Sequence, residues 1–516
     1  MNNTREAILE DLNSRVKSLP GKAIIEGFLT EKETTLVELP NVVEISTVAD
    51  FKNALSKAKT NTEYVIKEGE YTLGEVYCTI KGKASSPIRF IAEGNVVIKN
   101  SSINFENCEF LEFIGFTIQD LKVDWGVGLC FRGCSKNITI RNIEIQNLGY
   151  MSKESGINPL IILGTSSNPT TNILIDNCYI HDCDTGYCEA IALDGNITNS
   201  IVKNCTIDNT GNIGIDLQGN YSWVLDEVPD NEKESFVNQA RQCKVFNNVV
   251  MTCQSKYATS AGIYLDGSRE NKVYNNLVYN SQCGIEVGAE ESGADMYTND
   301  VFNNYILNCG IGLKVGGYLD ASAIVRDIRV FGNSIFTRKG FEENVALSLE
   351  KVKNLEFTNN VIYLDSDGVY LDNIGNSTFV DKGNSIISTN VDIFEEAPAP
   401  IVLTLQEQID KAGDNFTLDR DYVVDDILVL NKDFTLTLNG FSIICKGDFL
   451  SIEGSNTVSL TDTKNGSIIC NKGDFIKTKD TEKPTIVLQG VNIMKNKQLQ
   501  NSFGNCSLRI SGCNIA

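Results

Sequence analysis

The segment AGIYLDGSRENKVYNNLVYNSQCGIEVG, residues Ala261–Gly288, completes one pattern and then begins it again. The phrase GIYLDG is followed by KVYNNLVYN, after which GIEVG opens the first phrase a second time. Phrases of the KVYNNLVYN kind occur nine times, each centred on a glycine or an asparagine: Gly115, Asn142, Asn177, Asn204, Asn247, Asn275, Asn303, Gly332 and Asn359. From Asn247 onward the centres are 28, 28, 29 and 27 residues apart. A period in the twenties, built of short strands and turns, is typical of a stacked solenoid.

Both kinds of phrase alternate apolar and polar residues, which is the pattern of a β-strand with one buried face. We therefore predict an all-β chain in which each phrase forms one side of one coil of a parallel β-helix. Leucine-rich repeats have a similar length, but their leucine framework and helical arm are missing from this sequence. The central asparagines are expected to stack as a ladder at one turn, where their amides bond to one another and to the turn backbone.

The start of the solenoid is visible in the sequence as well. A helix predicted over Val48–Ala58 precedes the first coils and would cap the open end of the core. The segments Gly69-Glu70-Tyr71 and Pro87-Ile88-Arg89-Phe90 that follow resemble the opening of the pectate-lyase-like right-handed β-helix superfamily. This resemblance spans about Val43–Ser388 and implies a right-handed parallel β-helix. It leaves the function open, because the fold carries lyases, hydrolases, epimerases and non-catalytic spikes.

The sequence divides into four parts. Residues 1–42 are predicted to form a helical leader for attachment, and residues 43–394 the β-helix. The stretch EEAPAP at 395–400 is expected to be an extended linker. Residues 401–516 begin anew, with a helix predicted over Leu405–Lys411 and alternating strands after it, so we expect a second, smaller β-solenoid or β-rich domain.

Composition and charge exclude some classes of function. The chain has 45 basic against 67 acidic residues and a formal net charge of −22, which disfavours nucleic acid as a partner. Most of the 16 cysteines lie within apolar strand-like phrases, so we predict free buried thiols and folding in a reducing compartment. Neither a signal peptide nor an apolar run of about 18 residues is visible, so no membrane partner is expected.

Two columns of residues are predicted on the outer face of the second phrase. One contains Ala192, Asp216, Tyr264, Glu286 and Lys314, and the next contains Asp194, Gln218, Asp266, Gly288 and Gly316. Neighbouring coils are about 4.8 Å apart, so residues of adjacent coils lie within reach of one sugar ring. We expect a solvent-facing acidic strip in which Asp216, Glu286, Asp266 and Lys314 are the candidate catalytic residues.

An insertion lies beside this strip. The step from Asn204 to Asn247 grows to 43 residues, and the added segment carries Tyr221 and Trp223. Aromatic rings next to polar groups are a common way to hold sugars. The candidate substrate-binding residues are therefore Asp194, Gln218, Tyr221, Trp223 and Tyr264. The alternative is a solvated sheet with an unrelated loop.

Two chemistries suit these residues. A pair of carboxyl groups can hydrolyse a glycosidic bond as acid and base. Alternatively, the carboxylates can hold Ca²⁺ against an acidic polysaccharide, with Lys314 as the base of a lyase. No other cofactor is predicted, and no metal-ligating residue is assigned. The single histidine, His181, lies near three cysteines, but their spacing matches no common zinc pattern, so we expect it to bond to Asp182.

Three functions remain open from the sequence. The first is a bacteriophage virion appendage that resembles a tail spike. It would be made in the host cytoplasm, attach to other virion proteins through its termini, and bind host surface polysaccharide with or without cleaving it. Such spikes are usually homotrimers, and Phe131 and Ile162 are the candidates for an exposed apolar contact. The second is a secreted polysaccharide lyase or glycoside hydrolase, expected as a monomer, that acts on environmental polysaccharide in a groove of the β-helix. The third is a purely structural scaffold.

Overall fold

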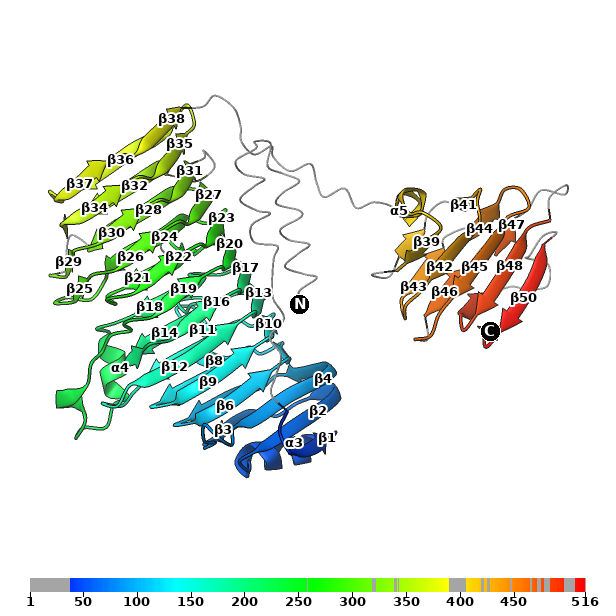
Figure 1. The fold of residues 1–516 in the computed structure, drawn as a ribbon, viewed down its shortest axis with the longest axis horizontal. Helices are drawn as coiled ribbons and strands as arrows, with labels where there is room; N and C mark the ends of the chain where they lie inside the picture. The colour runs from blue at the N-terminus through cyan, green and yellow to red at the C-terminus, as the bar shows by residue number, and fades with distance from the viewer. Residues whose placement is uncertain are drawn as a thin grey trace. The chain divides into compact units, whose positions relative to one another are not determined.

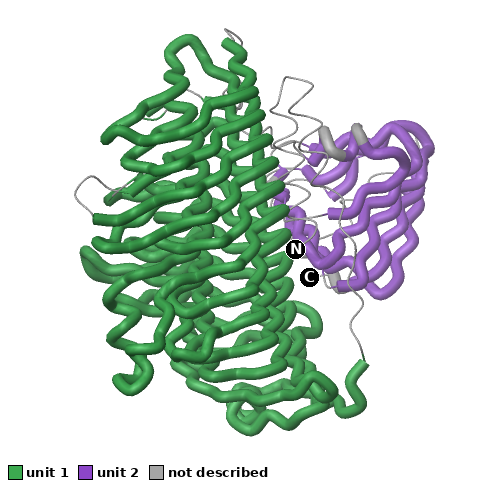
Figure 2. The backbone as a smooth tube through the Cα atoms, turned by 60° about the vertical axis from the view of Figure 1, so that its left-hand side comes forward, with its two compact units in different colours: residues 1–395 green, residues 396–516 purple. Residues whose placement is uncertain are grey.

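The computed structural model describes residues 38–388 and 405–515, with short gaps at 258, 318–321, 338–340, 342, 419–421, 425–426, 446–447, 465, 471–474, 478–482 and 496–505. The chain forms two compact units, Met1–Glu395 and Glu396–Ala516 (Figure 2). The predicted linker at 395–400, and all but the end of the predicted leader at 1–42, lie outside the described residues.

The first unit is a stack of coils whose strands pair in parallel with those of the next coil (Figure 1). The segment quoted above shows one such coil. It contains β21(Ala261–Asp266), β22(Lys272–Tyr274) and β23(Leu277–Tyr279), after which β24(Cys283–Ala289) pairs in parallel with β21. The prediction of an all-β parallel β-helix is confirmed.

The strands of this unit form three parallel sheets. The eleven-stranded sheet consists of β3(Glu75–Cys78), β5(Ser102–Glu106), β8(Gly126–Gly133), β11(Ile157–Gly164), β14(Ile191–Gly195), β18(Ile215–Gln218), β21, β24, β28(Ile311–Gly317), β32(Val345–Glu350) and β36(Val369–Ile374). A three-stranded sheet consists of β25(Asp295–Tyr297), β29(Ile324–Arg326) and β33(Val352–Lys353). The 24-stranded sheet consists of β1(Asn41–Ile45), β2(Thr62–Tyr71), β4(Ile88–Lys99), β6(Glu109–Ile114), β7(Thr117–Gln119), β9(Lys136–Arg141), β10(Glu144–Gln146), β12(Thr170–Asp176), β13(Tyr179–Cys183), β15(Ile197–Thr198), β16(Ile201–Lys203), β17(Thr206–Thr210), β19(Lys244–Phe246), β20(Val249–Cys253), β22, β23, β26(Asp300–Phe302), β27(Tyr305–Cys309), β30(Arg329–Phe331), β31(Ser334–Thr337), β34(Leu355–Thr358), β35(Val361–Leu364), β37(Phe379–Lys382) and β38(Ser385–Ser388).

The predicted capping helix is present as α3(Val48–Ser56), two residues shorter than expected. The hydroxyl of Thr47 caps it by accepting a hydrogen bond of 3.1 Å from the backbone N–H of Asp50. The helix buries Phe51 against Phe90, with ring centroids 6.3 Å apart. Apolar side chains continue from this cap through the coils as one buried cluster, so the core of the unit runs along the solenoid axis.

From Asn248 onward an asparagine ladder runs through the turns, one residue later than predicted. In an earlier coil the predicted centres do bond, since Nδ2 of Asn177 donates to Oδ1 of Asn142 at 2.9 Å. Asn275 has a φ of 54°, a left-handed conformation that turns the chain. The next residue, Asn276, is fully buried, and its Nδ2 donates to Oδ1 of Asn304 at 3.0 Å and to the carbonyl of Val273 at 3.0 Å. The ladder contains Asn248, Asn276, Asn304, Asn333, Asn360 and Asn384. The central asparagine therefore makes the turn, and the residue after it points inward and stacks.

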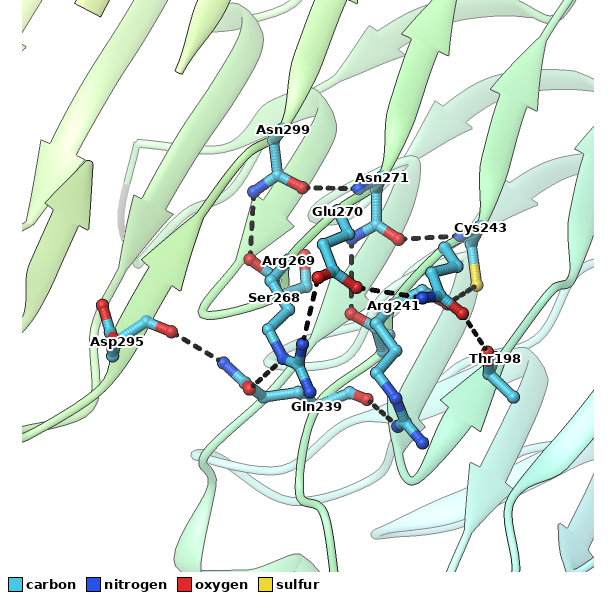
Figure 3. Close-up of polar contacts among 12 residues, drawn as sticks. Thr198, Gln239, Arg241, Cys243, Ser268, Arg269, Glu270, Asn271, Asp295 and Asn299 are labelled. Carbon is cyan, nitrogen blue, oxygen red and sulfur yellow. Dashed lines mark hydrogen bonds and ion pairs between the residues drawn. The ribbon is translucent and has the colours of Figure 1, made fainter. Parts of the chain in front are cut away.

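The predicted insertion leaves the solenoid as α4(Ser222–Asp226) and a 3-10 turn, η1(Lys233–Ser235). Its base is closed by a bridge between Gly219 and Gln239. Figure 3 shows how the side chain of Gln239 is held: its amide donates to the carbonyl of Asp295 at 2.9 Å and accepts from Nε of Arg269 at 2.8 Å. These bonds fix the Gln239 end of the insertion to neighbouring coils.

The second unit is a smaller parallel solenoid that begins with the helix predicted for it, α5(Leu405–Lys411). Its sheets are β39(Asn415–Thr417), β42(Phe434–Thr437), β45(Thr457–Thr461), β48(Thr485–Gln489) and β50(Ser507–Ser511); β40(Tyr422–Val424), β43(Ser442–Cys445), β46(Ser467–Cys470), β49(Asn492–Lys495) and β51(Asn514–Ile515); and β41(Leu428–Leu430), β44(Leu450–Ile452) and β47(Ile476–Lys477). It has its own apolar core.

Candidate functional site

The two predicted columns lie on the outer face of the eleven-stranded sheet with the predicted register. Asp216 pairs with Tyr264, Tyr264 with Glu286, and Glu286 with Lys314. In the adjacent column Gln218 pairs with Asp266. The sequence repeat therefore determines which side chains of neighbouring coils stand side by side.

The expectation that this acidic strip faces solvent is wrong. Asp194 and Asp216 are each 1% exposed, and Asp266 and Glu286 are each 2% exposed. The insertion covers part of the sheet, because Val224 of α4 packs on outward-facing apolar residues of the earlier coils, Ile161 and others. Asp194, Asp216 and Asp266 lie at the floor of a cavity, and burial disfavours the charged forms of all four carboxyl groups.

This cavity has a volume of about 760 Å³ and two chemically different halves. The apolar half is lined by Cys130, Ile161 and Leu163. The other half is lined by carboxyl groups: Glu189, Asp194, Asp216, Asp266 and Glu290. We call the whole cavity the acid cavity. Trp125, Tyr187 and Trp223 also line it and are 66%, 43% and 42% exposed, so they form an aromatic rim at its solvent side.

Most of the candidate residues line the acid cavity, but two of them do not. Asp194, Asp216, Gln218, Tyr221, Trp223, Tyr264 and Asp266 all line it. Glu286 and Lys314 are not among the lining residues; they form an ion pair of 2.9 Å. The strand that carries Tyr264 separates Glu286 from Asp216. The structure thus brings Asp216 and Asp266 to one site and leaves the Glu286–Lys314 pair beside it.

Hydrogen bonds distinguish the three aspartates of the cavity. Asp266 accepts a bond of 2.5 Å from the hydroxyl of Tyr221 and one of 3.3 Å from the backbone N–H of Glu290. Oδ2 of Asp216 accepts from the amide of Gln218 at 3.0 Å. Within the described part of the chain, Oδ1 of Asp194 and Oδ1 of Asp216 are buried and accept no hydrogen bond. Two acceptor oxygens at the cavity floor therefore have no donor among the described residues.

Burial raises the pKa of each carboxyl group at the floor. It raises the pKa of Asp194, Asp216 and Asp266 well above the usual range, and mutual repulsion among the carboxylates adds to the effect. Burial also raises the pKa of Glu189 to about 7, against the opposing hydrogen bond from Asn158. A buried carboxyl group that still holds its proton near neutral pH can act as a general acid.

Glu189 and the rim residues Trp125 and Tyr187 were not predicted. Glu189 comes three residues before Ala192, so the period-two alternation along β14 does not extend to it. The side chain of Glu189 is instead positioned by Asn158, whose Nδ2 donates to Oε2 of Glu189 at 3.1 Å. Trp125 and Tyr187 lie in turns before β8 and β14 and carry no repeat signal.

The Ca²⁺ expected for a lyase does not fit the arrangement found. Such an ion needs several oxygen ligands that converge on one point. Across the described ranges, no group of three His, Cys, Asp or Glu side chains is placed to hold a metal ion. His181 makes the predicted contact, with Nδ1 at 2.7 Å from Asp182, and Nε2 lies 3.2 Å from Glu144.

The predicted apolar contact surface is wrong. Phe131 and Ile162 are fully buried, because the strand phase points them into the core and turns their neighbours Cys130 and Ile161 outward, beneath the insertion. All 16 cysteines are free thiols, as predicted. Among the helices of the described residues, none is long and apolar enough to span a membrane.

Comparisons with known proteins agree with the fold. Residues 95–301 match the family model described as "Right handed beta helix region", in agreement with the parallel strand pairing and with the predicted right-handed parallel β-helix fold. The chain is 28% identical over 195 residues to the uncharacterized protein YwoF of Bacillus subtilis (strain 168), a match that covers 34% of this chain and 40% of that protein. The alignment thus spans less than half of the relative.

Two solved structures are similar in fold. A PL6 family polysaccharide lyase from Pseudopedobacter saltans has a TM-score of 0.45 and 14% identity, over 67% of this chain and 92% of that one. A tailspike protein mutant of E. coli bacteriophage HK620, in complex with a pentasaccharide, has a TM-score of 0.41 and 11% identity, over 87% of this chain and 73% of that one. At these identities the likeness concerns the fold alone.

Proposed function

We propose that the first unit binds a glycan in the acid cavity and hydrolyses a glycosidic bond there. The observation that carries this proposal is the combination of an exposed aromatic rim with buried carboxyl groups in one cavity. Sugar rings stack on aromatic faces while their hydroxyl groups donate to polar side chains. The two buried carboxyl oxygens that lack a donor, one on Asp194 and one on Asp216, are suited to accept from such hydroxyl groups.

The chemistry we propose uses two carboxyl groups with different surroundings. Glu189, with a pKa raised to about 7, gives its proton to the glycosidic oxygen as the bond to the anomeric carbon breaks. Asp266 takes a proton from water, whose oxygen forms the new bond to that carbon. Two donors, Tyr221 and the N–H of Glu290, partly offset the burial that raises the pKa of Asp266, and the step proceeds from the fraction of the protein in which Asp266 is charged. Solvent then returns the proton from Asp266 to Glu189.

Lys314 does not enter this mechanism. It lies outside the cavity lining and is paired with Glu286, which disfavours its use as the base of a lyase. Hydrolysis rather than elimination is therefore the reaction we propose. The two differ in product, since elimination leaves an unsaturated sugar that absorbs in the ultraviolet and hydrolysis leaves only a new reducing end.

The experiment is a screen of the purified full chain against a panel of neutral, aminated and acidic polysaccharides for new reducing ends. We expect Glu189→Gln and Asp266→Asn to abolish cleavage of the substrate found, with binding retained. Glu356→Gln, at an exposed residue of β34, is the matched control and should cleave normally. A substrate cleaved equally well by all three variants would place the reaction elsewhere, and no binding of any glycan would favour a structural scaffold.

For the biological setting of this activity we keep the proposal made from the sequence, a bacteriophage virion appendage. A virion appendage made in the host cytoplasm suits a chain with 16 free thiols, which oxidation in an extracellular compartment would threaten. A secreted enzyme is the alternative. Light scattering on the full chain in reducing buffer separates the two. We expect a virion appendage to be a homotrimer that binds other virion proteins through its termini, and we expect a secreted enzyme to be a monomer.

A further inference from the structure

Carboxyl groups outnumber cationic side chains in the described lining of the acid cavity. Six carboxyl groups line it: Glu189, Asp194, Asp216, Glu227, Asp266 and Glu290. Among the described residues, Arg132 is the one cationic side chain of the lining, and it forms an ion pair with Glu227, which neutralises that carboxylate. Glu189, Asp194, Asp216 and Asp266 thus share the cavity with no second cationic side chain in its described lining.

Two of these groups also lack hydrogen-bond donors on one oxygen. Oδ1 of Asp194 and Oδ1 of Asp216 are both buried, and no donor in the described part of the chain reaches them. The two residues belong to adjacent strands, β14 and β18, in which Ala192 pairs with Asp216. Parallel strands lie about 4.8 Å apart and rise about 3.3 Å per residue, so Asp194 and Asp216 are separated by about 8 Å at the backbone, and one small group placed between the side chains can contact both.

We propose that the glycan of the acid cavity carries a free primary amine, placed as an ammonium group between Asp194 and Asp216. This inference rests on the glycan site proposed above and names its substrate class. An ammonium group brings three hydrogen-bond donors and one positive charge, whereas a hydroxyl group brings one donor and no charge. It therefore satisfies both unpaired oxygens and offsets part of the charge imbalance in a single contact.

Other sugar substituents fit this lining less well. The carboxylate of a uronic acid would add a further negative charge to the carboxyl groups of the lining in a poorly solvated space. An acetylated amine keeps one N–H donor but loses the charge and adds bulk.

Binding of an ammonium group would change the protonation of the cavity. The titratable groups that face it are Glu189, Asp194, Asp216, Asp266 and Glu290, the Arg132–Glu227 pair, Cys130, Cys188, Tyr187, Tyr221 and Tyr264. Burial holds the pKa of the three aspartates high in the free protein. A bound cation favours their charged forms, so protons leave the carboxyl groups as the amine binds. Binding of a ligand that is already an ammonium ion in solution should therefore release protons to the buffer.

The test is calorimetric titration of the full chain at pH 5.5, where the glucosamine amines are protonated in solution, with oligomers of glucosamine, N-acetylglucosamine and galacturonic acid of equal length. We expect the glucosamine oligomer to bind at least about tenfold more tightly than the acetylated one and the acidic oligomer not to bind. Repeating the titration in buffers of different ionisation enthalpy should show proton release for the glucosamine oligomer.

Variants connect that preference to the two aspartates. Asp194→Asn or Asp216→Asn should remove the preference for the free amine and the proton release, while binding of the acetylated oligomer is kept. Asp184→Asn, at a half-exposed aspartate paired with Lys256, is the control and should behave as the parent chain. The melting temperature of each aspartate variant shows whether it is folded. Both variants are made because one that folds is enough for the test.

The outcomes separate this inference from the proposed function. Equal or tighter binding of the acetylated or acidic oligomer, or binding of the amine without proton release, would overturn the amine assignment and leave a glycan site in place. Failure of every oligomer and of the polysaccharide panel to bind would overturn the glycan site itself, and the amine with it.

Discussion

The hydroxyl group of Tyr221, from the insertion, donates a hydrogen bond of 2.5 Å to Oδ2 of Asp266, from strand β21 of the solenoid. This bond joins the covering segment of the acid cavity to its floor. It also favours the carboxylate form of an aspartate whose pKa burial raises. The phenol in turn stays protonated, because burial and the nearby carboxylate raise the pKa of Tyr221.

Tyr221→Phe should therefore raise the pKa of Asp266 further and move the acid limb of the activity profile to higher pH. We expect a loss of about tenfold in kcat at pH 6, for the loss of one hydrogen bond to a charged group. The measurement is a pH–rate profile on the substrate found by the screen. Tyr370→Phe removes a similar bond, of 2.6 Å to Asp381, far along the solenoid and should leave the profile unchanged. An unshifted acid limb in Tyr221→Phe would contradict the role of Asp266.

Glu189 should make stability depend on pH in a defined window. Folding raises its pKa from about 4.5 to about 7, so the stabilising contribution is complete below about pH 4.5 and is lost as pH rises through 7. The loss amounts to about 3 kcal/mol for a shift of this size. Thermal unfolding of the parent chain and of Glu189→Gln between pH 4.5 and 8 measures it. The melting temperature of Glu189→Gln should rise relative to that of the parent chain as pH increases. Parallel curves of melting temperature against pH would argue against the raised pKa of Glu189.

The asparagine ladder should be sensitive at one position and tolerant at its neighbour. Asn304→Ala leaves the backbone N–H and the side-chain amide of Asn276 without their shared acceptor, so we expect a loss of about 3 kcal/mol in the free energy of unfolding. Asn303→Gly keeps the left-handed turn at φ 55° and should cost less than about 1 kcal/mol. Chemical denaturation of both variants gives the comparison. Similar losses in the two would mean that the ladder bonds contribute little.

The aromatic rim should contribute affinity without chemistry. Trp125→Ala removes an exposed ring that stacks on Tyr187, with centroids 6.5 Å apart, and should weaken glycan binding by about tenfold through KM with kcat nearly unchanged. Met151→Ala, at a side chain that is 70% exposed, is the control for loss of surface area. A fall in kcat with constant KM would instead place Trp125 next to the reacting bond.

Much of the solenoid could be predicted because its rules are local and repeated. The spacing of Asn247, Asn275 and Asn303 fixed the length of a coil, and alternation along GIYLDG placed Tyr264 and Asp266 on one face. The ladder was displaced by one residue because sequence alone does not say which of two adjacent asparagines turns the chain. The same ambiguity of phase made Phe131 and Ile162 look outward-facing when they fill the core.

The candidate site could be predicted only in part, because its environment comes from a segment outside the repeat. No periodic signal states where the insertion folds back, so the burial of Asp216 and the exclusion of Lys314 from the cavity could not be read in advance. Glu189 escaped notice since the strand alternation ends before it. The repeat thus predicts the floor of the cavity, and the covering segment determines which floor residues meet a ligand.

The bridge between Gly219 and Gln239 has a consequence for how such proteins diversify. A segment whose two ends meet at one coil can be lengthened, shortened or exchanged without shifting the register of the coils on either side. The coils of the solenoid then stay unchanged, and the exchangeable insertion determines which ligand binds. Homologues that differ in glycan should differ in residues 220–238 while their coils still superimpose, and grafting that segment between them is a direct way to transfer specificity.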